Sequence, residues 1–324
     1  MMRAWDVANG DADGLCALHQ LRLAEPLAAT LVTGAKRDIE LLSRVEAGRG
    51  DRVTVLDVSL DRNRTALVRL LERGAKVLWF DHHHAGDVPA HPLLEAHIDA
   101  APAVCTSAIV DRWLGGRFRA WAVAAAFGDN LPETAAVLAA PLALDAAGLE
   151  ALKTLGETIN YNAYGESEAD LLVAPAELYR RMSGYADPFE FLDKEALLRE
   201  IGERRRADLA QALALAPYAE DARHAVYLLP DAPWSRRVGG AFANHLALAH
   251  PGRAHAVIGP HGSEAFWVSL RAPRRSPSGA SALARQFATG GGREAAAGID
   301  ELPRSRFEEF LRGFERAFGG AAAR

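Results

Sequence analysis

The chain has 324 residues, of which 49% are hydrophobic and 24% charged, so it has ample material for a packed core. Its formal net charge of −5 argues against a general nucleic-acid coat, and no apolar run reaches the roughly 18 residues of a membrane span. Chains of this length are usually too long to fold around a single hydrophobic core, so we expect two domains. Only Cys16 and Cys105 are present, which excludes a disulfide framework and a thiolate zinc site. With no apolar signal core at the start, we expect a cytoplasmic protein without a membrane partner.

The first eighty residues alternate between strand and helix patterns. Short β-branched runs predict strands, and longer amphipathic stretches predict helices. The expected strands are residues 3–8, 29–34, 52–58 and 75–81, with helices over 13–24, 38–47 and 61–73. This rhythm is typical of an α/β fold with a doubly wound, mostly parallel sheet.

The rest of the chain is predicted to be mostly helical and then α/β again. Helices dominate residues 105–215, ending in a long polar helix over 193–216 that Pro217 terminates. The tail holds expected strands at 224–229, 254–259 and 265–271 and helices at 237–249 and 279–288. We therefore expect an N-terminal domain over 1–190, a helical linker over 191–217 and a smaller α/β domain over 218–324.

The segment NGDADG, residues 9–14, follows the first expected strand. It matches the first half of an EF-hand loop, but the position that needs a bidentate Glu is Gln20, and an apolar helix follows directly. A calcium loop is therefore rejected. A strand-to-helix turn in which Asp13 caps the helix stays an alternative.

Acidic and histidine side chains follow several of the expected strands. They are Asp11 and Asp13 after the first strand, Asp57 at the end of the third, Asp81 with His82, His83 and His84 at the fourth, and Asp129 after an apolar helix at 121–127. The carboxyl ends of parallel strands line the ligand site of an open α/β sheet, and clustered carboxylates call for a cation. Oxygen and imidazole ligands suit Mn²⁺, Fe²⁺ or Zn²⁺. Taken singly, the same residues could be a turn cap and an exposed loop.

In this order the motifs resemble those of the DHH phosphoesterase superfamily. The matching segments are Asp11-Ala12-Asp13-Gly14, VLDVS with Asp57, Asp81-His82-His83 and GDN with Asp129, and GGGREAAAG at 290–298 resembles the glycine-rich motif of the family's C-terminal domain. The resemblance covers nearly the whole chain. It implies a manganese-type hydrolase with its active-site cleft between the domains, related to RecJ-type exonucleases, nano-RNases, 3′-phosphoadenosine-5′-phosphate phosphatases and cyclic-dinucleotide phosphodiesterases.

The resemblance also implies a role for each matching residue. Asp57 would bridge two Mn²⁺ ions, with Asp13, His82 and Asp129 on one ion and Asp11 on the other. His83, beside Asp81, would face the phosphate or serve the leaving group. The expected phosphate-binding residues are Arg271, Gly290, Gly291, Gly292 and Arg293.

Two positions depart from the family pattern. Val7 stands where many small members have a histidine ligand, which weakens the first metal site unless His84 or solvent compensates. Arg293 stands where the tail motif usually has His. Arginine can still bind phosphate bidentately, but it cannot transfer a proton.

Local patterns suggest two further phosphate contacts. Three glycines before the segment EAAA, which is expected to be helical, would let backbone amides meet an anion at a helix N-terminus, with a flexible loop as the alternative. Thr106 and Ser107 begin an expected helix, where capping is their ordinary role.

The expected activity is metal-dependent hydrolysis of a phosphoester bond in a small nucleotide or a short single-stranded oligonucleotide. The acidic charge and moderate length argue against a processive exonuclease, which needs a long basic channel, and against long duplexes. Two alternatives stay open: a nucleotide- and metal-binding protein with little turnover, and an inorganic pyrophosphatase. A homodimer is compatible with each.

Overall fold

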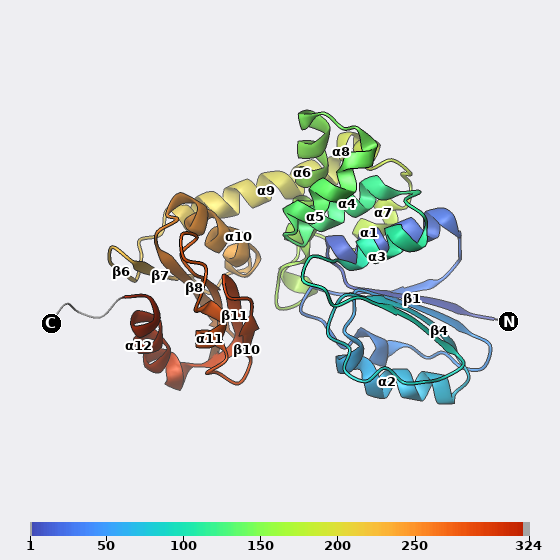
Figure 1. The fold of residues 1–324 in the computed structure, drawn as a ribbon, viewed down its shortest axis with the longest axis horizontal. Coiled ribbons are helices and arrows are strands. Elements are labelled where there is room, and N and C mark those ends of the chain that lie inside the picture. Colours follow the sequence, from blue (N-terminus) through green and yellow to red (C-terminus); the bar gives the residue numbers. More distant parts are fainter. Residues whose placement is uncertain (1, 320–324) are drawn as a thin grey trace. The chain divides into compact units, whose positions relative to one another are not determined.

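Five parallel strands form the sheet of the N-terminal unit (Figure 1). Their order is β2-β1-β3-β4-β5. The strands are β1 (Ala4–Ala8), β2 (Thr30–Val32), β3 (Arg52–Leu56), β4 (Lys76–Asp81) and β5 (Leu94–Ile98). The chain moves outward from β1 to β2 and then returns to the other side of β1 with β3. The predicted doubly wound parallel sheet is confirmed, with β5 as a strand that the sequence pattern did not indicate.

Helices cover both faces of this sheet. On one face, α2 (Leu60–Glu72) buries Leu67, Leu70 and Leu71 against valines of β3 and β4. On the other face, α1 (Ala12–Ala24) and α3 (Thr106–Trp113) pack on the sheet. The helix α1 is buried along most of its length because a further helical layer covers its outer side.

That outer layer confirms the predicted helical stretch after residue 105. It contains α4 (Arg119–Gly128), α5 (Pro132–Ala139), η2 (Ala140–Leu142), α6 (Ala146–Ala163), η3 (Glu168–Asp170), α7 (Pro175–Met182) and α8 (Pro188–Lys194). Its core is built around the fully buried rings of Trp121 and Phe191. No helix among the described residues is both long and apolar enough to cross a membrane.

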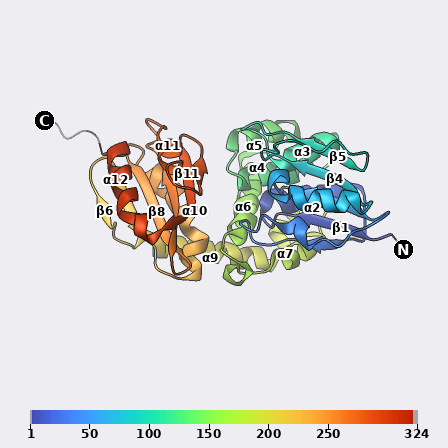
Figure 2. The same ribbon diagram turned by 90° about the horizontal axis from the view of Figure 1, so that it is seen from below.

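The C-terminal unit has a six-stranded mixed sheet in the order β10-β11-β9-β8-β7-β6 (Figure 2). Its strands are β6 (Ala219–Glu220), β7 (His224–Leu228), β8 (Ala254–His261), β9 (Ala265–Arg271), β10 (Gly290–Gly292) and β11 (Ala296–Pro303). Only β7 and β8 pair in parallel. The helix α10 (Pro233–Ala249) covers one face, while α11 (Ala280–Ala284) and α12 (Phe307–Phe318), preceded by η4 (Arg304–Arg306), cover the other.

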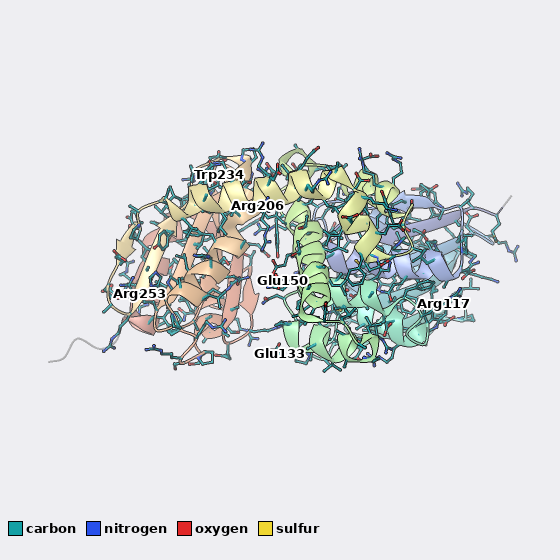
Figure 3. The ribbon with its side chains drawn as sticks, turned by 90° about the horizontal axis from the view of Figure 1, so that it is seen from above. Arg117, Glu133, Glu150, Arg206, Trp234 and Arg253 are labelled. Carbon is teal, nitrogen blue, oxygen red and sulfur yellow. The ribbon has the colours of Figure 1, made fainter. Side chains whose placement is uncertain are left out.

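The computed structural model describes residues 2–319. The chain divides into two compact units between Glu203 and Arg204, a point inside α9 (Ala196–Leu213). That helix lies within residues 191–217, the segment expected to be a linker. Exposed charged side chains are spread over both units, among them Arg117, Glu133 and Arg206 (Figure 3).

The helix predicted over 38–47 is wrong. The segment forms only the short helix η1 (Leu41–Arg44). Asn63 of α2 takes the place of helical partners, because its side chain accepts from the Leu42 N–H at 3.2 Å and donates to the Ile39 carbonyl at 2.6 Å. The apolar spacing indicated correctly that residues of this segment are buried. Its backbone conformation is set by the contact with Asn63, which local spacing does not indicate.

In the tail, one predicted helix is too long and another is wrong. The helix expected over 279–288 stops at Ala284, and the segment EAAA leads into β11. Gly290 packs so closely on the turn after α11 that a Cβ atom there would lie 1.8 Å from the Ala284 carbonyl oxygen. The glycines therefore belong to a β-hairpin, and the predicted anion site at a helix N-terminus does not exist there.

Candidate metal centre

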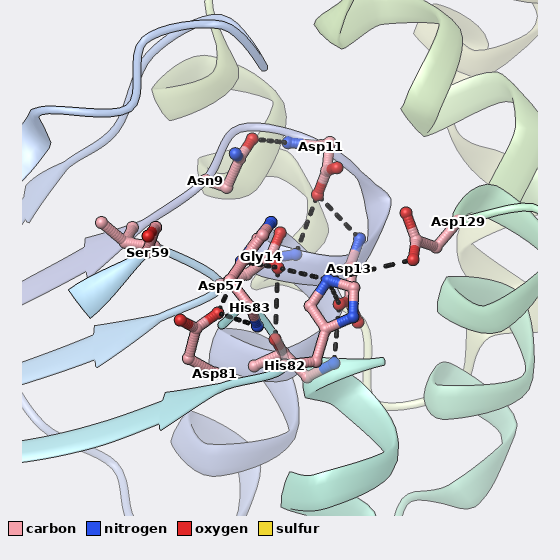
Figure 4. A network of polar contacts seen from close by, with 12 residues as sticks. Asn9, Asp11, Asp13, Gly14, Asp57, Ser59, Asp81, His82, His83 and Asp129 are labelled. Carbon is pink, nitrogen blue, oxygen red and sulfur yellow. Dashed lines mark hydrogen bonds and ion pairs between the residues drawn. The ribbon is translucent and has the colours of Figure 1, made fainter. Parts of the chain in front are cut away.

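The predicted residues of the N-terminal unit meet at the carboxyl edge of its sheet (Figure 4). Two groups of side chains bring their ligand atoms within 4.8 Å of one another: Asp13 with His82 and Asp129, and Asp57 with His82 and His83. They come from the start of α1 and from the residues that follow β3, β4 and α4. The edge lies where the strand order reverses between β1 and β3, the usual ligand position in such sheets.

The NGDADG segment makes a tight turn from β1 into α1. Asp11 is the N-cap of α1, since its Oδ1 accepts from the N–H groups of Asp13 and Gly14 at 3.0 Å. A Cβ at Gly14 would lie 2.3 Å from the Asn9 carbonyl oxygen, so glycine is required there. Capping is thus part of this segment's role, but Asp11 performs it and leaves Asp13 pointing elsewhere.

The side chain of Asp13 accepts hydrogen bonds from the N-terminus of a different helix. Its two carboxylate oxygens accept from the N–H groups of Thr106 and Ser107 at 2.7 Å each, at the N-terminus of α3. The Thr106 hydroxyl donates to Asp57 Oδ1 at 3.2 Å. These two residues therefore cap nothing with their own side chains. They position two carboxylates of the centre, a role that only the fold reveals.

Asp57 adopts a left-handed backbone conformation, with φ 57°. Among non-glycine residues this conformation is uncommon and tolerated best by Asp and Asn. It follows the last residue of β3 and turns the carboxylate into the cluster, where the side chain is 3% exposed. Strain of this kind is characteristic of positions that serve a site.

His82 is oriented by the backbone. Its Nδ1 donates to the Val104 carbonyl at 2.9 Å, which leaves Nε2 facing the cluster. Nε2 lies 3.4 Å from Asp57 Oδ1 and 4.0 Å from one oxygen each of Asp13 and Asp129. A carbonyl that holds the far nitrogen is a common support for a metal-binding histidine.

Asp81 and His83 form a separate pair. Asp81 is fully buried, and its Oδ1 accepts from His83 Nδ1 at 2.7 Å and from the His83 N–H at 3.2 Å. The side chain of His83 is 45% exposed. Because Nδ1 is held by Asp81, Nε2 is the nitrogen that His83 can offer to a substrate.

Asp129 reaches the cluster because two helices pack unusually closely. A Cβ at Gly156 of α6 would lie 1.8 Å from the Ala124 carbonyl oxygen of α4, and one at Gly128 would lie 2.4 Å from Ala12 Cβ. This close approach brings the end of α4 beside the start of α1. Asp129 caps the helix end there, and its side chain is 18% exposed.

Lys36 is a member of the cluster that the sequence interpretation missed. Its ammonium forms an ion pair with Asp11 Oδ2 and lies 3.5 Å from Asp129 Oδ1. The loop after β2 carries it, and the backbone is held by hydrogen bonds of Lys36 N–H to Ala163 O at 2.9 Å and of Asn9 Nδ2 to Lys36 O at 3.3 Å. A single lysine in a loop belongs to no sequence motif, so the sequence alone did not indicate its role.

The electrostatics of the cluster favour a bound cation. Burial, followed by the charges of Asp11 and Asp13, raises the pKa of Asp57 well above its usual range. Burial disfavours a charge on His82, but Asp57 and the other carboxylates outweigh it and raise the pKa of His82 to about 10. A cation bound among these carboxylates would offset their mutual repulsion.

The donor set fits a transition-metal ion better than calcium. Carboxylate oxygens and an imidazole nitrogen converge from different elements, and His82, Asp13 and Asp57 are each held by a further hydrogen bond. Val7, where a further histidine would be expected, lies in the apolar core under α2 and offers no donor. His84 is exposed and accepts from the Gly86 N–H at 3.3 Å.

The predicted phosphate-binding residues lie in the C-terminal unit. Arg271 ends β9, as expected, and its guanidinium donates to Asn244 Oδ1 at 2.8 Å and to Ser269 Oγ at 3.0 Å. Arg293 is exposed at the turn between β10 and β11, next to Gly290–Gly292. Arg271 pairs with Ala296 across the sheet, so both arginines belong to one end of it.

Comparison of the sequence with family models and with curated proteins finds no match. Solved structures do match over nearly the whole chain. An exonuclease RecJ bound to manganese is 18% identical with TM-score 0.61, covering 97% of this chain and 89% of that one. RecJ from Thermus thermophilus in complex with Mn²⁺ is 17% identical with TM-score 0.63, covering 97% of this chain and 51% of that one.

A third match is the pGpG-specific phosphodiesterase PggH from Vibrio cholerae. It is 15% identical with TM-score 0.51, and the match covers 95% of this chain and 96% of that one. The RecJ and PggH proteins are DHH-superfamily members. The chain therefore has the fold of these RecJ and PggH structures, as the resemblance of its ordered motifs implied.

Proposed function

We propose that the protein is a metal-dependent phosphoesterase that hydrolyses small nucleotides or short single-stranded oligonucleotides, with Mn²⁺ as its metal. One observation carries this proposal. Three carboxylates and two imidazoles from four segments converge at the switch point of a parallel sheet, and the hydrogen bonds of His82 and Asp13 leave the metal-binding atoms facing one another.

The structural relatives support the same chemistry. They are an exonuclease bound to manganese, a RecJ in complex with Mn²⁺ and a pGpG-specific phosphodiesterase. Nucleic acid and pGpG share the phosphodiester linkage. A phosphoester of a nucleotide is therefore the substrate class that we propose for this chain.

The chain's own residues divide into three roles. Asp13, Asp57, His82 and Asp129 would hold the metal, which when bound supplies Lewis acidity to a phosphoryl oxygen and to a water nucleophile. His83, held by Asp81, is placed to protonate the leaving oxygen through Nε2. Burial opposes its charge, but the hydrogen bond to Asp81 and the nearby carboxylates raise the pKa of His83 above its ordinary value, which favours the protonated form that a general acid needs.

The phosphate end of the substrate is assigned to Arg271 and Arg293. An exposed guanidinium at a hairpin turn can bind a terminal phosphate bidentately without a prior desolvation cost. Backbone N–H groups of the neighbouring glycines can add hydrogen bonds, because Gly291 and Gly292 are exposed.

The test is a substrate panel with the metal-stripped and Mn²⁺-loaded protein. The panel holds di- and trinucleotides, 3′-phosphoadenosine-5′-phosphate, cyclic dinucleotides and pyrophosphate, with product identification. We expect hydrolysis of a nucleotide substrate that depends on Mn²⁺. Turnover of none of these, or of pyrophosphate alone, would overturn the proposal.

A further inference from the structure

We propose that Lys36 takes the place of the second metal ion, so that the centre holds one divalent cation and one fixed ammonium group. The inference rests on the proposed function, because it concerns the metal centre that this function requires. In this proposal Lys36 is a positioning residue: its ammonium group holds the carboxylates of Asp11 and Asp129 and supplies a positive charge beside the metal ion.

The contacts of Asp11 are the first reason. Its Oδ1 is occupied by the N–H groups of Asp13 and Gly14, and its Oδ2 is paired with the Lys36 ammonium. Neither group of potential ligands among the described residues includes Asp11. The Asp11 oxygen that does not cap α1 is therefore paired with a lysine, which a second ion would have to displace.

The missing ligand is the second reason. Val7 is fully buried in the apolar cluster beneath α2, so no imidazole stands behind Asp11. A divalent ion on this side would lack that imidazole and would have to compete with the Lys36 ammonium for Asp11. A lysine ammonium needs no set of coordinating ligands, because its positive charge is part of the side chain.

The way Lys36 is held is the third reason. Both of its backbone polar groups are bonded, one to Ala163 and one to Asn9. Its ammonium lies 5.9 Å from the centre of the Tyr164 ring, and the side chain is 29% exposed. The ammonium bridges Asp11 and Asp129, two carboxylates that come from different segments of the chain. A cation fixed there offsets carboxylate repulsion as a second ion would.

Metal counting tests the inference without measuring turnover. The full-length protein is stripped of metal and titrated with Mn²⁺, and bound ions are counted by calorimetry and by the electron paramagnetic resonance signal. We expect one tightly bound Mn²⁺ per wild-type chain with the signal of an isolated ion. Lys36→Met keeps the length of the side chain but removes its charge, and we expect it to bind two ions with a spin-coupled signal.

Two further variants complete the design. Arg37→Ala removes the exposed neighbouring charge and Lys36→Arg keeps the charge, and both should still bind one ion. Melting curves of each variant confirm that it is folded. Two equally tight ions in the wild type, or a single ion in Lys36→Met, would overturn the role of Lys36 alone. No bound Mn²⁺ in any variant would instead remove the metal centre and the proposed function with it.

Discussion

The two units hold their predicted site residues in opposite ways. In the N-terminal unit, Asp13 and Asp57 are almost completely buried and bonded to elements far away in the chain. In the C-terminal unit, Arg293 is exposed on a hairpin turn. The first arrangement fixes ligand atoms for an ion, whereas the second presents a charge to solvent.

This difference follows from what each task requires. A metal ion needs several donors in one fixed geometry, and buried hydrogen bonds between elements supply that rigidity. A phosphate group can be met by one guanidinium and by backbone amides near the surface. We therefore expect changes in the N-terminal cluster to abolish turnover and changes in the hairpin to weaken substrate binding.

The largest effect is expected for Asp57→Asn. Asparagine tolerates the left-handed backbone at this position, and its amide oxygen can still accept from Thr106. Loss of the central carboxylate should lower kcat/KM by about 10³-fold or more, which is about 4 kcal/mol. Steady-state kinetics with saturating Mn²⁺ measure it.

The folded state of this variant provides the control. Because burial and neighbouring carboxylates raise the pKa of Asp57, its charge does not stabilise the metal-free fold. The melting temperature of metal-free Asp57→Asn should equal or exceed that of the wild type. Retained activity in the folded variant would remove Asp57 from the centre.

The second effect concerns pH and the metal. In the metal-free protein the pKa of His82 is about 10, so His82 is protonated at neutral pH. Mn²⁺ requires the neutral imidazole, so binding releases a proton and affinity rises with pH. With one proton released, the affinity should increase about 100-fold from pH 6 to pH 8. Calorimetry in buffers of different ionisation enthalpy counts the protons. An affinity that is constant over this interval would contradict the placement of His82.

The third effect separates two adjacent glycines of the hairpin. A Cβ at Gly290 would collide with the Ala284 carbonyl, while one at Gly291 meets no atom within 4 Å. Gly290→Ala should therefore lower the free energy of unfolding by about 1–3 kcal/mol. Gly291→Ala should change it by less than about 0.5 kcal/mol. Urea unfolding distinguishes them, and equal effects would show that packing on α11 is not what requires Gly290.

The smallest effect is expected for Arg293→Ala. Because the side chain is exposed, its loss should leave the melting temperature unchanged and raise KM about tenfold with little change in kcat, which corresponds to about 1.4 kcal/mol of binding. Arg312→Ala, an exposed arginine on α12, is the matched control. A fall in kcat without a change in KM would place Arg293 in the chemical step.

Much of the N-terminal fold could be predicted because its signals are local. A β-branched run marked β3, and the alternation of strand and helix patterns along the chain marked β1, β4 and α2. The same signals failed over 38–47, where Asn63 satisfies the backbone instead of a helix. They failed again at EAAA, where alanine's helical preference yielded to pairing of β11 with β9.

The sequence by itself determined the acidic and histidine groups of the candidate centre, because ordered motifs at strand ends identify residue types and their sheet edge. Tertiary structure alone decided what each group does. The α3 amides hold Asp13, the glycine contact of α4 and α6 delivers Asp129, and a loop places Lys36 against Asp11. These contacts join residues far apart in the chain, so no local pattern can encode them.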